Sequence, residues 1–299
     1  MALFLLSAPP VFLLGPLAAL LAVGRPSSWR EGLWLAAALL WSIAWLATTG
    51  GAADQLVKGA GVLVTGAFVL LTLRWDAPPF RRGAVAVLLA GLAVTAWFAI
   101  LGIGWTQVEN DVVRTLRDGF DAQAKLYSAS GGDASRQVSE VLKQMADAAP
   151  AFAQILPGTL VLLALAGTLL GWRWYAAIAT RPLGTPPGPF AAFTFHDQWV
   201  WVVILALVPV ATVGLVPWPA WVRAAAANLL LVAGTLYAAR GAAVVRGTLD
   251  RVPWPVLVAV AMVTLLLFWF VIGGLILLGL ADAWVDFRRR LAANSEGDA

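Results

Sequence analysis

Residues 83–104 read GAVAVLLAGLAVTAWFAILGIG and carry no charged side chain. The hydrocarbon core of a bilayer is about 30 Å thick, so roughly 20 apolar residues of helix are needed to cross it. This stretch meets that length. Seven more stretches are comparably apolar: 2–23, 32–49, 55–73, 152–172, 199–217, 221–245 and 254–281. The sequence therefore predicts an all-α fold, a polytopic transmembrane helical bundle with about eight spans.

The composition agrees with a membrane protein. Of the 299 residues, 61% are hydrophobic and 12% are charged, whereas soluble domains carry roughly 25% charged residues. The net charge of +4 is spread over many short loops, which excludes nucleic acid as a partner and favours the lipid bilayer. The absence of Cys excludes thiol chemistry, and the single histidine, His196, excludes a multi-His metal site. We expect no cofactor and no metal.

A polar segment divides the chain. Residues 1–104 hold four spans, and residues 105–150 then place Val108, Val112 and Leu116 at near-helical spacing, with a second apolar repeat after a break at 128–132. This pattern predicts an amphipathic helical hairpin between the fourth and fifth spans, on the membrane surface or capping the bundle. A second membrane region follows at 151–291, and 292–299 is predicted to be a disordered tail.

The orientation is only partly decided by charge. Positive-inside counting places the loops 24–31, 74–82, 173–198 and 240–251 in the cytoplasm when the basic residues of 105–150 are left out of the count. Eight crossings would then leave Arg288 and its two basic neighbours on the opposite side. Either residues 254–287 form a hairpin broken near Gly273 and Gly274, or one N-terminal stretch does not cross fully.

Polar residues inside apolar stretches are candidate functional residues, because burying them in lipid is costly without partners. The seventh stretch contains Asn228, Gly234, Tyr237, Arg240 and Gly241. Gly234, Tyr237 and Gly241 share one helix face, where small residues allow another helix to approach closely. Asn228 and Tyr237 are candidates for binding a solute, and helix packing with satisfied polar groups is the alternative.

Two further groups stand out. Asp282 and Asp286 are four residues apart on one helix face, with Arg288 close by, which suits a cation or paired acid–base chemistry, structural anchoring, or partner docking. His196 is framed by Phe193, Phe195 and Trp201. It is either a proton switch near neutral pH or an interfacial residue at the start of a span.

Catalytic templates are absent from the sequence. It contains no zinc-binding HExxH, no phosphate-binding loop of the Walker type and no Ser-centred GxSxG. We therefore expect that the protein is not an enzyme.

The second half contains four groups of residues: Pro157-Gly158, Phe193 with Val200-Trp201, Asn228…Gly234…Leu236-Tyr237…Gly241 and Gly279…Asp282…Asp286-Phe287-Arg288. In these residues it resembles the YybS-like bacterial membrane proteins, a domain of unknown function (DUF2232), over roughly residues 150–291. The resemblance implies a multi-pass protein of the bacterial inner membrane. It also implies a distant similarity to the S components of energy-coupling-factor transporters, which bind a solute and dock on a membrane scaffold driven by ATPases.

Two functions remain open, with a lipid-handling enzyme at Asp282 and Asp286 as a minor third. A transport-type solute-binding subunit predicts a cavity lined by Asn228, Tyr237 and the aromatic residues of 190–201. It also predicts a small-residue docking face such as Ala18, Ala19 and Ala22. A non-transporting envelope or scaffold protein would instead use 105–150 and 190–201 to bind another membrane protein.

Overall fold

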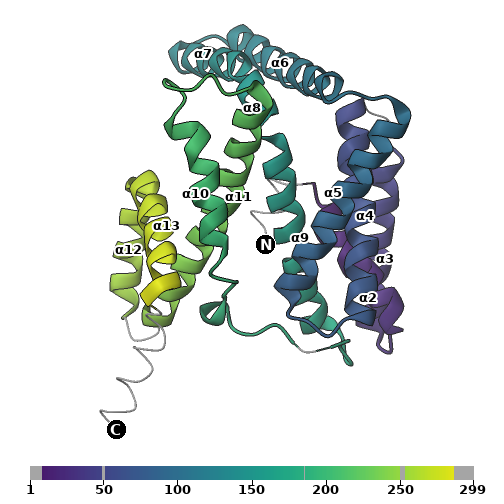
Figure 1. Cartoon of the computed structure of the whole chain (residues 1–299). Coiled ribbons are helices and arrows are strands. Elements are labelled where there is room, and N and C mark those ends of the chain that lie inside the picture. The colour runs from purple at the N-terminus through teal and green to yellow at the C-terminus, as the bar shows by residue number, and fades with distance from the viewer. Residues whose placement is uncertain (1–8, 49–50, 185, 250–252, 286–299) are drawn as a thin grey trace. The chain divides into compact units, whose positions relative to one another are not determined.

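The computed structural model describes residues 9–48, 51–184, 186–249 and 253–285. Every regular element in these ranges is helical: there are twelve α-helices, one short 3₁₀ helix and no strand (Figure 1). The chain forms two compact units, residues 1–187 and residues 188–299. Each unit has its own helix contacts and is described by itself.

The first unit contains eight helices with α2 at its centre. They are α2 (Val11–Gly24), α3 (Trp29–Leu46), α4 (Ala52–Arg74), α5 (Pro79–Leu101), α6 (Trp105–Ser130), α7 (Asp133–Asp147), α8 (Ala149–Gln154) and α9 (Leu156–Ile178). Helix α2 packs against α3, α4 and α9. Its residues Leu17, Leu20 and Leu21 are buried together with Trp172 and Tyr175 of α9. The core of this unit is therefore built around an uncharged helix.

Small residues let α9 lie against α2. A Cβ on Gly171 would stand 2.9 Å from the backbone oxygen of Leu13, and Gly167 is similarly close to Phe12. This is the small-xxx-small spacing by which membrane helices approach closely. Ala18 of α2 is buried, whereas Ala22 is exposed. Part of the predicted docking face is thus used in packing inside the unit.

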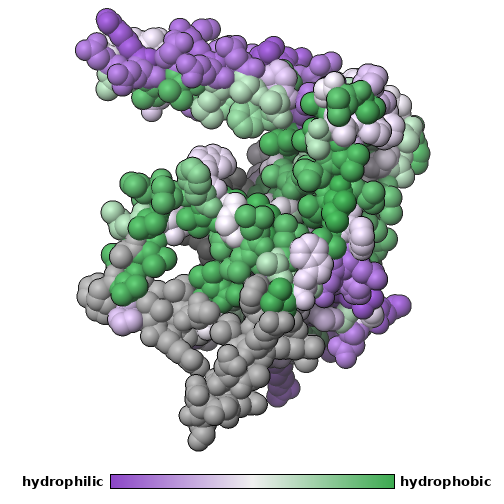
Figure 2. Space-filling view, turned by 60° about the vertical axis from the view of Figure 1, so that its left-hand side comes forward, coloured by the Kyte–Doolittle hydropathy of each residue, from purple (hydrophilic) through white to green (hydrophobic). Residues whose placement is uncertain are grey.

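The polar segment forms α6 and α7, which pack on one another within the first unit. Gly131 and Gly132 join them with φ of +72° and +97°, a conformation that glycine adopts without strain. Val108 and Val112 pack into a small cluster with Ala153. The Asp111 carboxylate accepts a hydrogen bond from the Ala53 backbone at 3.1 Å, which fixes α6 to the start of α4. Figure 2 shows hydrophilic residues along the outer surface of this helix pair.

The second unit is organised around α11. Its elements are η1 (Phe190–Ala192), α10 (Trp199–Ala211), α11 (Ala220–Leu249), α12 (Trp254–Leu266) and α13 (Phe268–Val285). Helix α11 contacts α10, α13 and η1. Most of the large side chains of α12 that are described are exposed, as expected for a surface that faces lipid.

Five helices in the described part of the chain are long and apolar enough to cross a membrane: Ala53–Arg74, Pro79–Leu101, Leu156–Ile178, Ala220–Gly247 and Phe268–Val285. Helices α2 and α10 are apolar but shorter. The last predicted stretch is two helices that break at Leu267, and Gly273 and Gly274 lie inside α13. The structure supports five spans, and the count of eight stays a prediction.

Candidate functional site

A buried arginine joins α11 to α13 in the second unit. The Nε atom of Arg240 donates to Oδ2 of Asp282 at 2.9 Å, and its Nη2 donates to the backbone oxygen of Asp282 at 3.3 Å. The side chains of Arg240 and Asp282 are only 6% and 1% exposed. A buried charge needs such a partner, because its desolvation otherwise costs several kcal/mol.

The same arginine also holds the loop before α10. Its Nη1 donates to Oδ1 of Asp197 at 2.6 Å and to the backbone oxygen of Phe195 at 3.4 Å. The Asp197 side chain is 62% exposed, unlike that of Asp282. One guanidinium therefore connects three segments of the unit through one buried and one exposed carboxylate.

Two glycines allow this arrangement. A side chain on Gly241 would clash with the backbone oxygen of Leu275, and one on Gly279 would clash with that of Tyr237. The two helix backbones thus lie in direct contact, which brings Arg240 within reach of Asp282 across the interface.

One aromatic ring lies over the guanidinium. The Arg240 guanidinium lies 5.6 Å from the centroid of the Phe195 ring, and this ring meets Tyr237 edge-on at 5.0 Å. Tyr237 is fully buried, and its hydroxyl has no hydrogen-bond partner in the described ranges. The pair of Arg240 with Asp282 is buried, which strengthens the attraction between these two charges. The cluster is suited to a structural role, in which it holds α11, α13 and the loop before α10 together.

The predicted site residues separate into two groups. Tyr237, Gly241, Phe195 and Asp282 meet at the cluster. Asn228 donates to the Ala224 backbone oxygen of its own helix at 2.8 Å, and a Cβ on Gly234 would meet Ile276 of α13 at 3.8 Å.

The remaining predicted residues lie elsewhere. Phe193 stacks on Phe190 with ring centroids 6.2 Å apart. His196 and Trp201 are exposed, and the His196 ring accepts a hydrogen bond from the Gln198 backbone at 3.3 Å. Asp286 and Arg288 lie outside the described residues. No group of three or more His, Asp or Glu that could hold a metal ion occurs in the described part of the chain.

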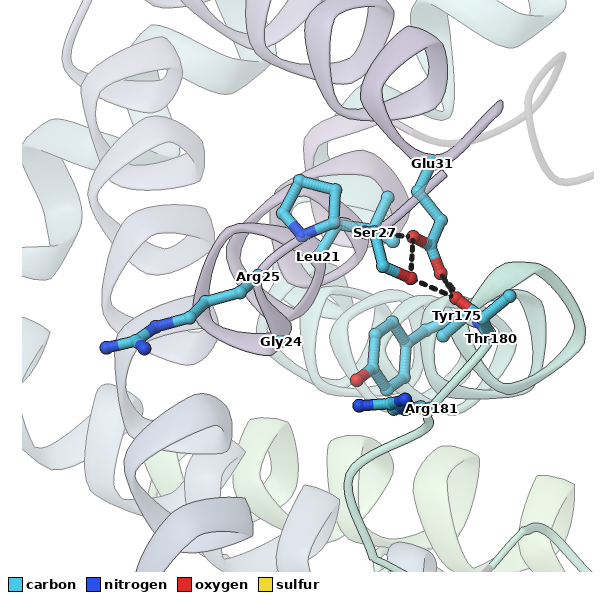
Figure 3. Close-up of a pocket in the computed structure, with 10 residues that line it drawn as sticks. Leu21, Gly24, Arg25, Ser27, Glu31, Tyr175, Thr180 and Arg181 are labelled. Atoms are coloured by element: carbon cyan, nitrogen blue, oxygen red, sulfur yellow. Dashed lines mark hydrogen bonds between the residues drawn. The ribbon is translucent and has the colours of Figure 1, made fainter. Parts of the chain in front are cut away.

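A cavity of about 230 Å³ lies in the first unit, where α2 and α9 end and α3 begins (Figure 3). It is lined by Leu21, Gly24, Arg25, Ser27, Glu31, Tyr175, Thr180 and Arg181, among others. Its wall combines an apolar side with a carboxylate, hydroxyls and two guanidinium groups. Ligand sites have this mixed character, although they usually measure about 300–1,000 Å³. This cavity therefore suits a small chemical group.

Glu31 holds the cavity wall together. One carboxylate oxygen accepts from the backbone and the hydroxyl of Thr180, both at 2.6 Å. The other accepts from the backbone nitrogens of Ser27 and Ser28 at 2.6 and 2.9 Å, and from the Ser27 hydroxyl at 3.4 Å. The Thr180 side chain, followed by the backbones of Thr180 and Ser28, holds the pKa of Glu31 well below its ordinary value of 4.5.

This carboxylate was not among the predicted site residues. Ser28 and Glu31 form a capping box at the start of α3, in which each side chain binds the other's backbone. The S-x-x-E spacing is visible in the sequence and marks Glu31 as a helix cap. The contacts with Thr180 join residues 149 positions apart, and no local pattern indicates them.

A second cavity, of about 170 Å³, lies among α2, α4, α5 and α9. Its lining is mainly apolar and includes Phe12, Val64, Val87 and Leu160. This lining offers a ligand little specificity, because few polar groups fix an orientation there.

Comparison with known proteins places the whole chain in one family. No curated protein and no solved structure gives a significant match. One family model, described as "Predicted membrane protein (DUF2232)", matches residues 1–283 and so extends well beyond the second half of the chain. The protein belongs to the DUF2232 family of predicted membrane proteins.

Proposed function

We propose that this protein is a non-catalytic, solute-binding membrane subunit of a transport system in the bacterial inner membrane. The observation that carries the proposal is the cavity at the ends of α2 and α9. It opens to the surface, is lined by the ends of α2 and α9, the start of α3 and the loop residues beside them, and has Glu31 fixed in its wall. Sites between helices of a bundle are a common place for a small ligand. The similarity to S components of energy-coupling-factor transporters belongs to this proposal, as does a membrane scaffold with ATPases as partner.

The hydrogen bonds of Glu31 support binding because they hold the segments of the cavity wall together. Glu31 joins the loop after α2 to Thr180, two residues after the end of α9, through hydrogen bonds of 2.6 Å to Thr180. A site on fixed helix ends needs little ordering when a ligand enters, which favours affinity.

The test is a solute screen on the purified full-length protein in nanodiscs. Pools of small polar solutes are added and the thermal unfolding midpoint is followed, because a ligand that binds the folded state raises it. We expect at least one pool to stabilise the wild type. The effect should weaken in Thr180→Val, which loses a hydroxyl of the cavity wall.

The matched control is Thr115→Val. Thr115 is an exposed residue of α6 whose hydroxyl donates to its own helix at 2.8 Å, and it lies away from the cavity lining. It should respond to solutes like the wild type. The proposal fails if no pool stabilises the wild type, or if the response is unchanged in Thr180→Val.

A scaffold role is the alternative, and one feature of α7 favours it. Val138, Val141 and Met145 are exposed along one face of this otherwise polar helix. Such a strip suits contact with another membrane protein or with the bilayer surface. Absence of any solute response, together with stoichiometric recovery of an envelope protein that is lost in Val141→Asp, would favour this role.

A further inference from the structure

The end of the first unit that contains the cavity is strongly basic. Six exposed arginines lie at the ends of α2, α4 and α9 and at the starts of α3 and α5: Arg25, Arg30, Arg74, Arg81, Arg173 and Arg181. In the described residues, none of their side chains forms a hydrogen bond or an ion pair. The nearby acidic residues are Glu31 and Asp76. This end therefore attracts anions.

Two of the arginines line the cavity. Arg25 and Arg181 belong to its wall, together with Tyr175 and Thr180. In Figure 3 the Arg181 side chain lies beside the Tyr175 ring, and Arg25 extends from the other side of the end of α2 with its guanidinium pointing away from Glu31. Both are long side chains in solvent, so their guanidinium groups are free to turn towards a ligand at the cavity mouth.

Glu31 does not make this a cation site. Both of its carboxylate oxygens are already used, one by Thr180 and the other by Ser27 and Ser28. An ammonium group would have to displace these hydrogen bonds to bind there. The guanidinium groups of Arg25 and Arg181 offer donors to a ligand, whereas both oxygens of the Glu31 carboxylate already accept hydrogen bonds, so an anion is favoured over a cation.

We propose that this cavity binds a phosphate group, held by Arg181 and Arg25 beside Tyr175. This inference rests on the proposed function, because it names the chemical class that the cavity takes. Guanidinium groups match phosphate oxygens through paired hydrogen bonds. The volume of about 230 Å³ accommodates the phosphate and a small attached group. Leu21 and Ala179 supply an apolar wall for the attached group. A lipid headgroup and a soluble phosphate ester share this chemistry.

The experiment separates the two sources with the full-length protein in phosphatidylcholine nanodiscs. In one arm, glycerol phosphate is titrated at constant ionic strength, with sulfate as the competing anion. In the other arm, part of the phosphatidylcholine is replaced by phosphatidylglycerol. Binding is read from the unfolding midpoint and from native mass spectrometry. Stabilisation in the first arm identifies a soluble ligand, and stabilisation in the second arm alone identifies a lipid.

The variants test the named residues. Arg25→Gln/Arg181→Gln should weaken binding by about tenfold or more, since both charged donors are lost. The matched control is Arg74→Gln/Arg173→Gln, which removes the same charge from the same end but leaves the cavity lining intact. It should bind within about twofold of the wild type. All four positions are exposed, so folding is checked by equal midpoints without ligand.

Equal loss of binding in both double variants would overturn the inference, because it would indicate attraction by the basic end as a whole. No response to either phosphate source would also overturn it. If a phosphate-free solute still stabilises the protein and Thr180→Val abolishes that effect, the proposed function stands and the phosphate assignment fails. If no solute or lipid of any class stabilises the protein, both fail.

Discussion

At the scale of single residues, the two carboxylates that bind Arg240 should contribute very differently to stability. Asp282 is 1% exposed and Asp197 is 62% exposed. Removing one partner of a buried ion pair costs about 3–5 kcal/mol, whereas an exposed pair contributes about 0–1 kcal/mol. We therefore expect a large loss of unfolding free energy for Asp282→Asn and a small loss for Asp197→Asn, measured by denaturant titration in mild detergent. Equal losses for the two variants would contradict the assignment of Asp282 as the main partner.

Glu31 should make stability depend on pH at the acid end. Its pKa is lowered on folding, so the carboxylate stabilises the folded state fully above its ordinary value of 4.5. That contribution is lost progressively as the pH falls below this value. The difference in unfolding midpoint between the wild type and Glu31→Gln should be largest near neutral pH and should narrow steadily in acid. A difference that stays constant down to about pH 3 would show that the charge of Glu31 is not involved.

The sequence predicts part of the site at this scale. Tyr237 and Gly241 are candidates because polar and small residues are costly or unusual in apolar helices, and Asp282 is a candidate because of its spacing from Asp286. The three residues meet in the structure. Arg240 lies in the same apolar stretch as Tyr237, but its central role depends on Asp282, which is 42 residues away. Hydropathy and spacing describe one helix at a time. Neither hydropathy nor spacing indicates which other helix a given helix packs against.

At the scale of helices, contact between α11 and α13 should tolerate a methyl group at one glycine and reject it at another. A Cβ on Gly279 clashes with a backbone oxygen of α11, whereas one on Gly273 meets nothing within 4 Å. Gly279→Ala should therefore destabilise the protein by roughly 1–3 kcal/mol, as overpacking does. Gly273→Ala, on the same helix, should be neutral or stabilising by up to about 1 kcal/mol, because alanine favours helix. If both variants behave alike in thermal unfolding, close backbone contact does not hold α11 to α13.

Helix existence is well predicted from the sequence, and helix ends are less so. The predicted stretch 83–104 corresponds to α5, Pro79–Leu101. The helix begins before the apolar stretch because proline is tolerated in the first turn and because the residues of that turn need not be apolar. The sequence predicts the stretch 254–281 as one span, or residues 254–287 as a hairpin broken near Gly273 and Gly274, whereas the structure has a break at Leu267. Neither proline nor glycine marks this break in the sequence. Hydropathy measures whether residues favour lipid, and both helices do, so it does not detect where the backbone turns.

At the scale of the whole molecule, the first unit should expose its two ends on opposite sides of the membrane. Helix α4 begins beside α6, where the Asp111 carboxylate accepts a hydrogen bond from the Ala53 backbone. It ends at Arg74, in the basic end of the unit. Arg74 and Gln137 of α7 are both exposed. The chain has no cysteine, so Arg74→Cys and Gln137→Cys each provide a single labelling site. With a membrane-impermeant maleimide, Arg74→Cys should react only from the cytoplasmic side, because positively charged loops remain there. Gln137→Cys should react only from the other side. Labelling of both from one side would contradict a membrane-crossing α4, and exchanged sides would place the basic cavity outside the cell.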